Sequence, residues 1–396
     1  MDDIRKDFPV LKNNPWVAYL DSACTSLKPQ AVIDAEASYY SEMGACGGRS
    51  SHRLGRRTSE MAESAREEVA RFVNADAGGL IWTRNATEGL NIVALGMDYA
   101  ARKKVVTTSM EHHAVLLPLM RLRDEGVIKL EVIGPEPDGS VSMETWKNAI
   151  DRETALVMTH SWDNTTGCGH PVREIAAISH ERGALICVDG AQGVPHHRTD
   201  LKKEKVDFLC FSAHKMLGPG GIGALAARRE HLGKLRPLLT GGGTVKAVSG
   251  GKIVPVDDQS RFEAGVQNYG GMMGFAEACR YLKKIGMENV ERSEEALAAG
   301  LRKALDAAGA KVYGPASGAH GSLFSFNIGG AKPHDVALML DKEGVAVRSG
   351  FFCAQPAMEA LGAKEGAVRA SCYVYNNADD IKKFRDALLK IGSLYS

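Results

Sequence analysis

Short apolar segments that alternate with longer amphipathic segments constrain the fold of this chain more than any other feature. Strand-length apolar runs occur at residues 105–108, 127–133, 155–159, 184–188, 206–211 and 222–226. Between several of these runs lie stretches with helical spacing, at residues 115–124, 143–150 and 172–182. Near-continuous apolar strands separated by helices predict a mostly parallel sheet with helices on both faces. We therefore expect an α/β fold.

The pattern changes toward the C-terminus. Residues 239–271 are rich in glycine and polar residues, so we expect a long irregular segment there. Two helical patterns follow, at residues 272–285 and 290–308, and shorter strands and helices continue to the end. We predict a large α/β domain at residues 16–271 and a small α+β domain formed by residues 1–15 and 272–396.

Composition excludes several classes of protein. With 44% hydrophobic residues among 396, the chain has enough apolar material for sizeable cores, unlike a disordered protein. A net charge of +1 provides no general attraction to nucleic acid. The apolar runs are shorter than the ~20 residues of a membrane span, and the charged N-terminus lacks the apolar region of a signal peptide. We expect a cytoplasmic protein without a membrane or nucleic-acid partner.

The chain has eight cysteines, and no two of them form a C-x-x-C pair. A zinc ribbon or a thioredoxin-like site is therefore not indicated, and we expect no metal. Cys187 and Cys210 lie in apolar strand patterns and should fill the core. Cys353 is flanked by a glycine and a proline, which favours an exposed, shaped loop. Cys24 and Cys46 lie in turn-rich segments, and their roles stay open.

Two polar groups follow neighbouring strand patterns. Asp189 comes directly after the run at 184–188, and Lys215 comes shortly after the run at 206–211. Either residue alone would be an ordinary loop residue, but ligands of parallel sheets bind at this edge. Pyridoxal phosphate needs a lysine for covalent attachment and a carboxylate beside its pyridine nitrogen. Thr87 precedes a helical pattern whose free N–H groups could hold the phosphate, although an ordinary helix cap would look the same.

Six short motifs occur in a specific order along the chain. They are residues 86–89 (ATEG), 111–113 (EHH), 188–192 (VDGAQ), 211–215 (FSAHK), 261–265 (RFEAG) and 348–356 (RSGFFCAQP). In this order and spacing the chain resembles the pyridoxal-phosphate enzymes of the class V aminotransferase group, and most closely the SUF-type cysteine desulfurases. The resemblance runs from residues 19–23 to 368–371. It implies the fold type I transferase fold, with a seven-stranded, mostly parallel sheet sandwiched by helices and a smaller C-terminal α+β domain.

The resemblance also implies roles for individual residues. For the cofactor, it implies covalent attachment to Lys215, a pyridine partner in Asp189, and a stacked, proton-relaying ring in His112. It also implies contacts to the phenolate side from Gln192 and Asn164, phosphate contacts from Thr87, Ser212 and His214, and a further cofactor contact from Ala86. For the substrate, it implies that Arg369 binds the α-carboxylate, with Arg348, Arg53 and Asn164 nearby, which suits the forked guanidinium group. Cys353 would accept the sulfur, and Lys215, Cys353 and His112 would be the catalytic residues.

Four features of the sequence depart from the family pattern. Val266 stands where the family has a threonine that reaches the phosphate in the neighbouring subunit, so that contact is lost or Gln267 replaces it. Phe351 and Phe352 stand where histidines are common. The segment at 160–164 is one residue longer than usual, and Arg56 replaces a histidine.

The resemblance implies a homodimeric cysteine desulfurase that converts L-cysteine to L-alanine. Sulfur would leave as a persulfide on Cys353, pass to an acceptor protein or small thiol, and supply iron–sulfur cluster or other sulfur-cofactor assembly. The alternatives are a selenocysteine lyase, a cysteine-sulfinate desulfinase, another class V aminotransferase or an epimerase. A non-enzymatic sulfur-assembly scaffold is disfavoured, because a scaffold would not require Lys215, Asp189, His112 and Cys353 together.

Overall fold

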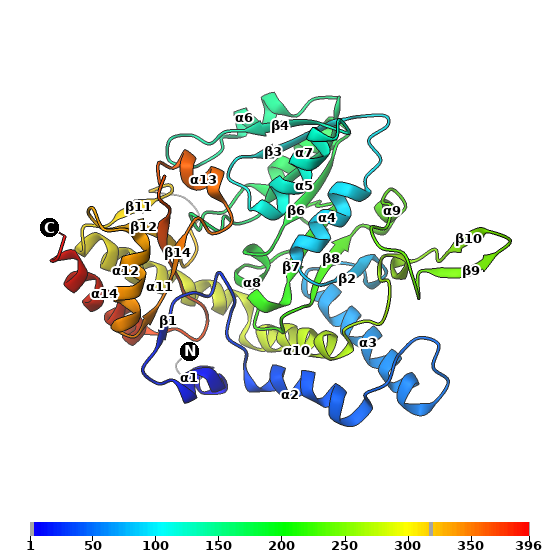
Figure 1. Ribbon diagram of the computed structural model, residues 1–396, viewed down its shortest axis with the longest axis horizontal. Coiled ribbons are helices and arrows are strands. Elements are labelled where there is room, and N and C mark those ends of the chain that lie inside the picture. Colours follow the sequence, from blue (N-terminus) through cyan, green and yellow to red (C-terminus); the bar gives the residue numbers. More distant parts are fainter. Residues whose placement is uncertain (1–3, 317–319, 396) are drawn as a thin grey trace.

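A computed structural model describes residues 4–316 and 320–395 (Figure 1). Residues 1–3, 317–319 and 396, which belong to the predicted small domain, lie outside the described residues. No helix among the described residues is both long and apolar enough to cross a membrane.

A seven-stranded sheet forms the centre of the larger part of the molecule. Its strands are β2 (Leu80–Thr83), β3 (Lys104–Thr108), β4 (Lys129–Ile133), β5 (Thr154–His160), β6 (Leu185–Asp189), β7 (Phe208–Ser212) and β8 (Gly223–Ala227). The spatial order is β2-β8-β7-β6-β5-β3-β4, and only β8 runs antiparallel to its neighbours. The predicted fold, with a mostly parallel seven-stranded sheet, is therefore confirmed.

Helices cover both faces of this sheet because its strands are apolar on both sides. In β7, Phe208 and Cys210 belong to one apolar cluster, whereas Leu209 and Phe211 belong to another. Two helices, α4 (Ala86–Gly96) and α5 (His113–Asp124), pack in the first cluster. Four helices pack in the second cluster: α3 (Arg53–Phe72), α6 (Met143–Ala149), α7 (Val172–Glu181) and α10 (Tyr269–Ile285). This two-sided burial is what the continuous apolar runs predict.

A four-stranded antiparallel sheet forms the smaller part, at the end of the molecule that carries the C-terminus (Figure 1). Its strands, in spatial order, are β11 (Lys311–Tyr313), β12 (Leu323–Asn327), β15 (Ala367–Ser371) and β14 (Arg348–Gly350). Three helices supply apolar residues to its core: α11 (Met287–Ala307), α12 (Pro333–Lys342) and α14 (Ala378–Gly392). A short parallel pair, β1 (Ala18–Tyr19) with β13 (Val345–Ala346), connects the N-terminal segment to this part.

The predicted domain division stays a proposal. Phe8 lies in the segment assigned to the small domain, but it packs in the apolar cluster of the large sheet. Phe275, on α10, packs in the same cluster.

The shorter helical elements are η1 (Ile4–Asp7), α1 (Pro9–Asn13), α2 (Gln30–Ser38), η2 (Tyr39–Met43), η3 (Ala77–Gly79), α8 (Gly193–His196), η4 (Ala213–Lys215), α9 (Arg229–Leu232), η5 (Gln259–Phe262) and α13 (Gln355–Ala360).

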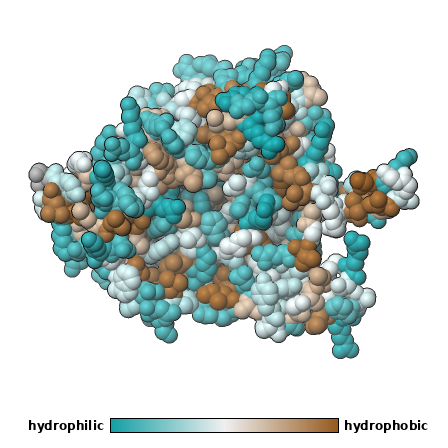
Figure 2. Space-filling model, viewed as in Figure 1, coloured by the Kyte–Doolittle hydropathy of each residue, from teal (hydrophilic) through white to brown (hydrophobic). Residues whose placement is uncertain are grey.

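The segment at 239–271 is not irregular throughout, so this expectation was wrong in part. It contains a hairpin of β9 (Val245–Ser249) and β10 (Lys252–Pro255), which projects from the body of the molecule (Figure 1). Gly250 and Gly251 form its turn with φ of 56° and 74°, a conformation that favours glycine. Figure 2 shows hydrophobic residues on this projection, where Val248 and Ile253 are each 68% exposed.

Candidate active site

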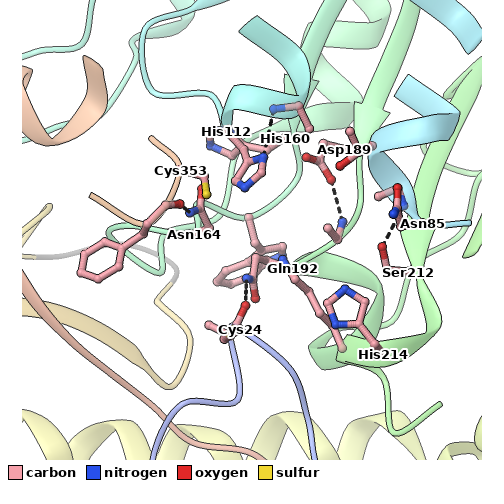
Figure 3. A pocket seen from close by; sticks show the side chains of 18 of the residues that line it. Cys24, Asn85, His112, His160, Asn164, Asp189, Gln192, Ser212, His214 and Cys353 are labelled. Atoms are coloured by element: carbon pink, nitrogen blue, oxygen red, sulfur yellow. Dashed lines mark hydrogen bonds between the residues drawn. The ribbon is translucent and has the colours of Figure 1, made fainter. Parts of the chain in front are cut away.

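A cavity of about 260 Å³ opens at the carboxyl ends of β5, β6 and β7 (Figure 3). Residues of both sheets line it, so the cavity lies between the two parts of the molecule. The predicted site residues that line the cavity are Ala86, Thr87, His112, Asn164, Asp189, Gln192, Ser212, His214, Lys215, Arg348, Cys353 and Arg369. Arg53 does not line it; Arg53 is the exposed first residue of α3. Its predicted contact with substrate has no support within this one chain.

Lys215 and Asp189 face the same cavity from adjacent strand ends. Burial lowers the pKa of Lys215, although Asp189 opposes this shift. Burial raises the pKa of Asp189, and the hydrogen bond from the Ala191 N–H to Oδ1 (2.9 Å) opposes that shift. Among the described residues, none donates a hydrogen bond to the other carboxylate oxygen of Asp189. The site therefore holds an amine that loses its proton readily and a carboxyl group with an oxygen free for a ligand.

The start of α4 forms a cradle for an anion. Asn85 caps this helix, since its side chain accepts the N–H of Glu88 at 3.0 Å. The Ala86 N–H donates to Ser212 Oγ at 2.8 Å, which brings the helix start against the end of β7 (Figure 3). A Cβ at Gly223 would lie only 2.7 Å from Asn85 Cα, so this close approach requires glycine. The helix dipole and the Thr87 N–H, which lies between these two bonded N–H groups, favour a bound phosphate beside Thr87.

His112 is a neutral side chain with a defined tautomer. Burial and the nearby Lys215 lower its pKa to about 3. Its Nδ1 accepts the Ala114 N–H at 3.0 Å, so the single ring proton is on Nε2. His214 is also neutral, because burial and Lys215 lower its pKa to about 4. Gln192 is fixed by a hydrogen bond from its Nε2 to the Ala23 carbonyl (2.9 Å).

Cys353 lies in a conformationally strained loop. Phe352 and Cys353 have φ of 54° and 56°, a left-handed conformation that is unfavourable for these residue types. Two hydrogen bonds hold the loop: Asn164 Nδ2 donates to the Phe352 carbonyl at 2.9 Å, and the His113 N–H donates to the Cys353 carbonyl at 2.7 Å. Cys353 itself is exposed at the cavity. The loop therefore presents a thiol to solvent and to the cavity.

Arg369, on β15, is a buried cation with spare hydrogen-bonding capacity. It is 3% exposed, and its Nη1 donates to the Asn164 carbonyl at 2.9 Å. Its guanidinium lies 4.7 Å from the centre of the Phe352 ring, and Asp21 Oδ1 lies 3.7 Å from Nη2. Its Nε is buried without a hydrogen-bond partner. A buried donor without a partner is costly, so a carboxylate ligand would complete this site.

Several lining residues have no role in the sequence analysis. Asp21 is not among the lining residues, but its carboxylate lies 3.7 Å from Arg369 and 3.9 Å from Arg348, which both line the cavity. Cys24 lines the cavity and accepts a hydrogen bond from Arg348 at 3.0 Å, whereas Cys46 is exposed elsewhere. His160 ends β5, so the search for polar residues at strand ends could have found it. Trp162 and Asn85 also line the cavity.

Val266 and Gln267 lie outside the cavity, near the hairpin segment. Val266 is 76% exposed. Gln267 Nε2 already donates to the main-chain carbonyls of Glu263 (2.9 Å) and Gly265 (3.2 Å). Replacement of the lost threonine contact by Gln267 would therefore require these bonds to break.

Comparisons with known proteins point to a single family. The family model described as Aminotransferase class-V matches residues 18–384. A probable cysteine desulfurase of Pyrococcus abyssi is 38% identical over 391 residues, which is 98% of this chain and 96% of the relative. The solved apo structure of cysteine desulfurase from Thermococcus onnurineus NA1 is similar with a TM-score of 0.95 at 38% identity, over 99% of this chain and 98% of the other. A cysteine desulfurase from Escherichia coli is similar with a TM-score of 0.89 at 29% identity, over 100% and 98% of the two chains.

Proposed function

The chain belongs to the class V aminotransferase family, and on that premise we propose that it is a pyridoxal-phosphate-dependent cysteine desulfurase. The substrate is L-cysteine, the product is L-alanine, and the sulfur leaves as a persulfide on Cys353. The observation that carries the assignment is the placement of an exposed thiol and a half-buried lysine on one cavity. An aminotransferase or an epimerase has no use for that thiol.

The residues present fit the cofactor. Lys215 would hold it covalently, and the free oxygen of Asp189 would pair with its pyridine nitrogen. Thr87, Ser212 and the first turn of α4 would hold its phosphate. Their fit rests on the close contact between α4 and β7 and on the unpaired carboxylate oxygen. When bound, pyridoxal phosphate supplies an electron sink that stabilises negative charge on the substrate α-carbon.

Substrate binding would use the spare donor of Arg369. The α-carboxylate would pair with this guanidinium, which the Asn164 carbonyl and Asp21 hold in place. Arg348 is half exposed at the entrance, so it would contribute a more flexible charge. The buried position of Arg369 strengthens this ion pair, because water screens it less there.

Proton transfer would use the lowered pKa values of Lys215 and His112. Lys215 is the general base that removes the α-proton, since burial favours its neutral amine. His112 is neutral and carries its proton on Nε2, so it is a donor rather than a base. After losing its proton, the Cys353 sulfur attacks the substrate sulfur, and an S–S bond forms as the substrate C–S bond breaks. The electron pair of the broken bond stays with the β-carbon, which takes up a proton to become the methyl group of the released alanine. The phenylalanines at 351–352 leave the thiol without a histidine in its own loop.

The direct test compares wild type with Cys353→Ala during incubation with L-cysteine. We expect stoichiometric alanine and persulfide from wild type, and loss of protein-bound persulfide with an intact cofactor absorption band from the variant. Cys46→Ala is the matched control, because this exposed thiol does not line the cavity. Full sulfur transfer by Cys353→Ala would refute the role of this thiol.

Three further measurements test the assignment and its alternatives. Lys215→Ala should lose the borohydride-reducible link to the cofactor, and persistence of that link would refute the assignment of Lys215. Parallel assays with selenocysteine and cysteine sulfinate distinguish the lyase and desulfinase alternatives from the desulfurase. A purified protein without a cofactor absorption band would indicate a scaffold.

The partners we propose are a second copy of the chain and a sulfur acceptor, either a protein or a small thiol. A dimer would give Arg53 and the segment at Val266 a function, since neither reaches the cavity of its own chain. Sedimentation of the purified protein tests the dimer. Transfer of sulfur from the Cys353 persulfide to iron–sulfur assembly proteins, compared with transfer to small thiols, tests the acceptor.

A further inference from the structure

A buried hydrogen-bond network lies beside the proposed cofactor site. Glu111 is completely buried and accepts three hydrogen bonds: Thr108 Oγ1 and Thr159 Oγ1 donate to its Oε1, each at 3.0 Å, and His160 Nδ1 donates to its Oε2 at 2.9 Å. Because Glu111 is the acceptor in all three hydrogen bonds, Nδ1 of His160 carries a proton.

The second ring nitrogen of His160 faces another histidine. His160 Nε2 lies 3.0 Å from His170 Nε2, so one of these two nitrogens carries the shared proton. Asp163 Oδ2, at 3.8 Å from His160 Nε2, favours the proton on His160. Burial disfavours the charge on His160, but Glu111, Asp163 and Asp189 outweigh it and raise the pKa of His160 to about 9. Burial and the charge on His160 lower the pKa of His170, which is therefore a neutral acceptor.

Asp189 is the neighbour of His160 in the central sheet. The register of β5 and β6 pairs the two residues, so their side chains extend from the same face of adjacent strands. Both line the cavity, and Figure 3 labels both. Burial and the charge of Glu111 raise the pKa of Asp189, whereas Lys215 and His160 lower it. Without a cation at this edge of the sheet, Asp189 would take up a proton more readily.

We infer that His160 is a positioning residue: its imidazolium, held by Glu111 and by neutral His170, keeps Asp189 ionised to receive the cofactor's pyridine nitrogen. This inference rests on the proposed function. His160 acts through Asp189. Lys215 also favours the ionised form of that carboxylate, but burial lowers the pKa of Lys215, so His160 is the cation that we assign to this role. The network thereby connects β3, β5 and the loop before His112 to the strength of cofactor binding.

The experiment is a double-mutant cycle on cofactor affinity with His160→Gln, Asp189→Asn and the double variant. Glutamine keeps a donor to Glu111 but cannot carry a charge. We expect His160→Gln to weaken pyridoxal phosphate binding at pH 7.5 about tenfold, the equivalent of a one-unit change in pKa. If His160 acts through Asp189, the double variant should bind within about twofold of Asp189→Asn, because effects on one interaction are not additive. Additive losses would overturn the inference.

A second readout does not need the cofactor. The readout is ¹⁵N-histidine NMR of the cofactor-free wild type at pH 7.5. The resonances of His160 are those that disappear in His160→Gln, and they should show that both ring nitrogens carry a proton. A neutral ring there would overturn the inference whatever the affinities. His196→Gln is the matched control, since His196 forms a buried pair with Glu294 (2.7 Å) outside the cavity. It should leave cofactor affinity unchanged. A wild type that binds no cofactor would instead refute the proposed function, and the NMR result would still decide the charge of His160.

Discussion

The side-chain amide of Asn164 donates a hydrogen bond to the main-chain carbonyl of Phe352 at 2.9 Å. The carbonyl of the same Asn164 accepts from Arg369 at 2.9 Å. One residue thus anchors both the loop of Cys353 and the arginine proposed to hold the substrate carboxylate. The left-handed backbone at Phe352 and Cys353 depends on such contacts, because nothing in those side chains favours it.

We predict that Asn164→Ala slows persulfide formation because the loop of Cys353 loses an anchor. Loss of one buried hydrogen bond to the loop costs about 1–2 kcal/mol, which corresponds to a roughly tenfold slower persulfide formation. Single-turnover assays measure that rate, and hydrogen exchange at residues 351–354 should rise with it. Asn289→Ala removes an exposed hydrogen bond to Ile285 and serves as the control. An unchanged rate together with unchanged exchange would show that the loop does not need this anchor.

Cys24 lines the cavity but accepts a hydrogen bond from Arg348 rather than extending from a strained loop. We predict that Cys24→Ala still forms the protein persulfide with L-cysteine, because Cys353 is the acceptor. The KM for L-cysteine should rise about two- to threefold, since Arg348 loses a modest hydrogen bond that orients it. Steady-state kinetics measure this change. Loss of the persulfide in Cys24→Ala would show that Cys353 is not the thiol that accepts the sulfur.

We predict that Asp207, which does not line the cavity, makes the stability of the fold depend on pH. Burial opposes its ionisation, but hydrogen bonds from His231 (3.0 Å) and His180 (2.8 Å) lower its pKa below the usual value. A carboxyl group with a lowered pKa in the folded state stabilises the fold above its unfolded pKa of about 4, and this contribution is lost as the pH falls further. We expect Asp207→Asn to lose about 3 kcal/mol of unfolding free energy at pH 7 and less below about pH 4.

Urea unfolding at the two pH values measures this difference. The control is Asp76→Asn, which removes an exposed ion pair with Lys202 and should cost less than about 1 kcal/mol at either pH. An equal loss for Asp207→Asn at both pH values would show that its ionisation does not contribute.

Val266 tests the proposed dimer. If its exposed segment meets the phosphate site of a second chain, Val266→Thr restores a hydroxyl donor there. We expect the affinity for pyridoxal phosphate to rise about three- to tenfold, the equivalent of about 0.7–1.4 kcal/mol, which is the net contribution of a typical hydrogen bond. Equilibrium titration measures the affinity, and Val266→Ala controls for the change in volume. A monomer in sedimentation with no response to Val266→Thr would contradict the dimeric site.

The central sheet and its functional edge follow from local sequence patterns. Periodicity places the strands, and a parallel sheet brings their carboxyl ends to one edge whatever the details of packing. This is why Asp189 and Lys215 could be placed together from the sequence. The hairpin at residues 245–255 was missed because its strands are short and exposed on both faces, so they lack the apolar run on which the strand predictions relied.

By itself, the sequence determined the fold class, the order of the main strands along the chain and the polar side chains that follow those strands at the functional edge, because these depend on residue type and short-range spacing. Only the tertiary structure decided which groups hold those side chains and how they are charged. Asn164 and Phe352 lie 188 residues apart, and Glu111 and His160 lie 49 apart, so no local pattern connects them. Burial, which depends on the whole packed chain, also decides that His112 is neutral.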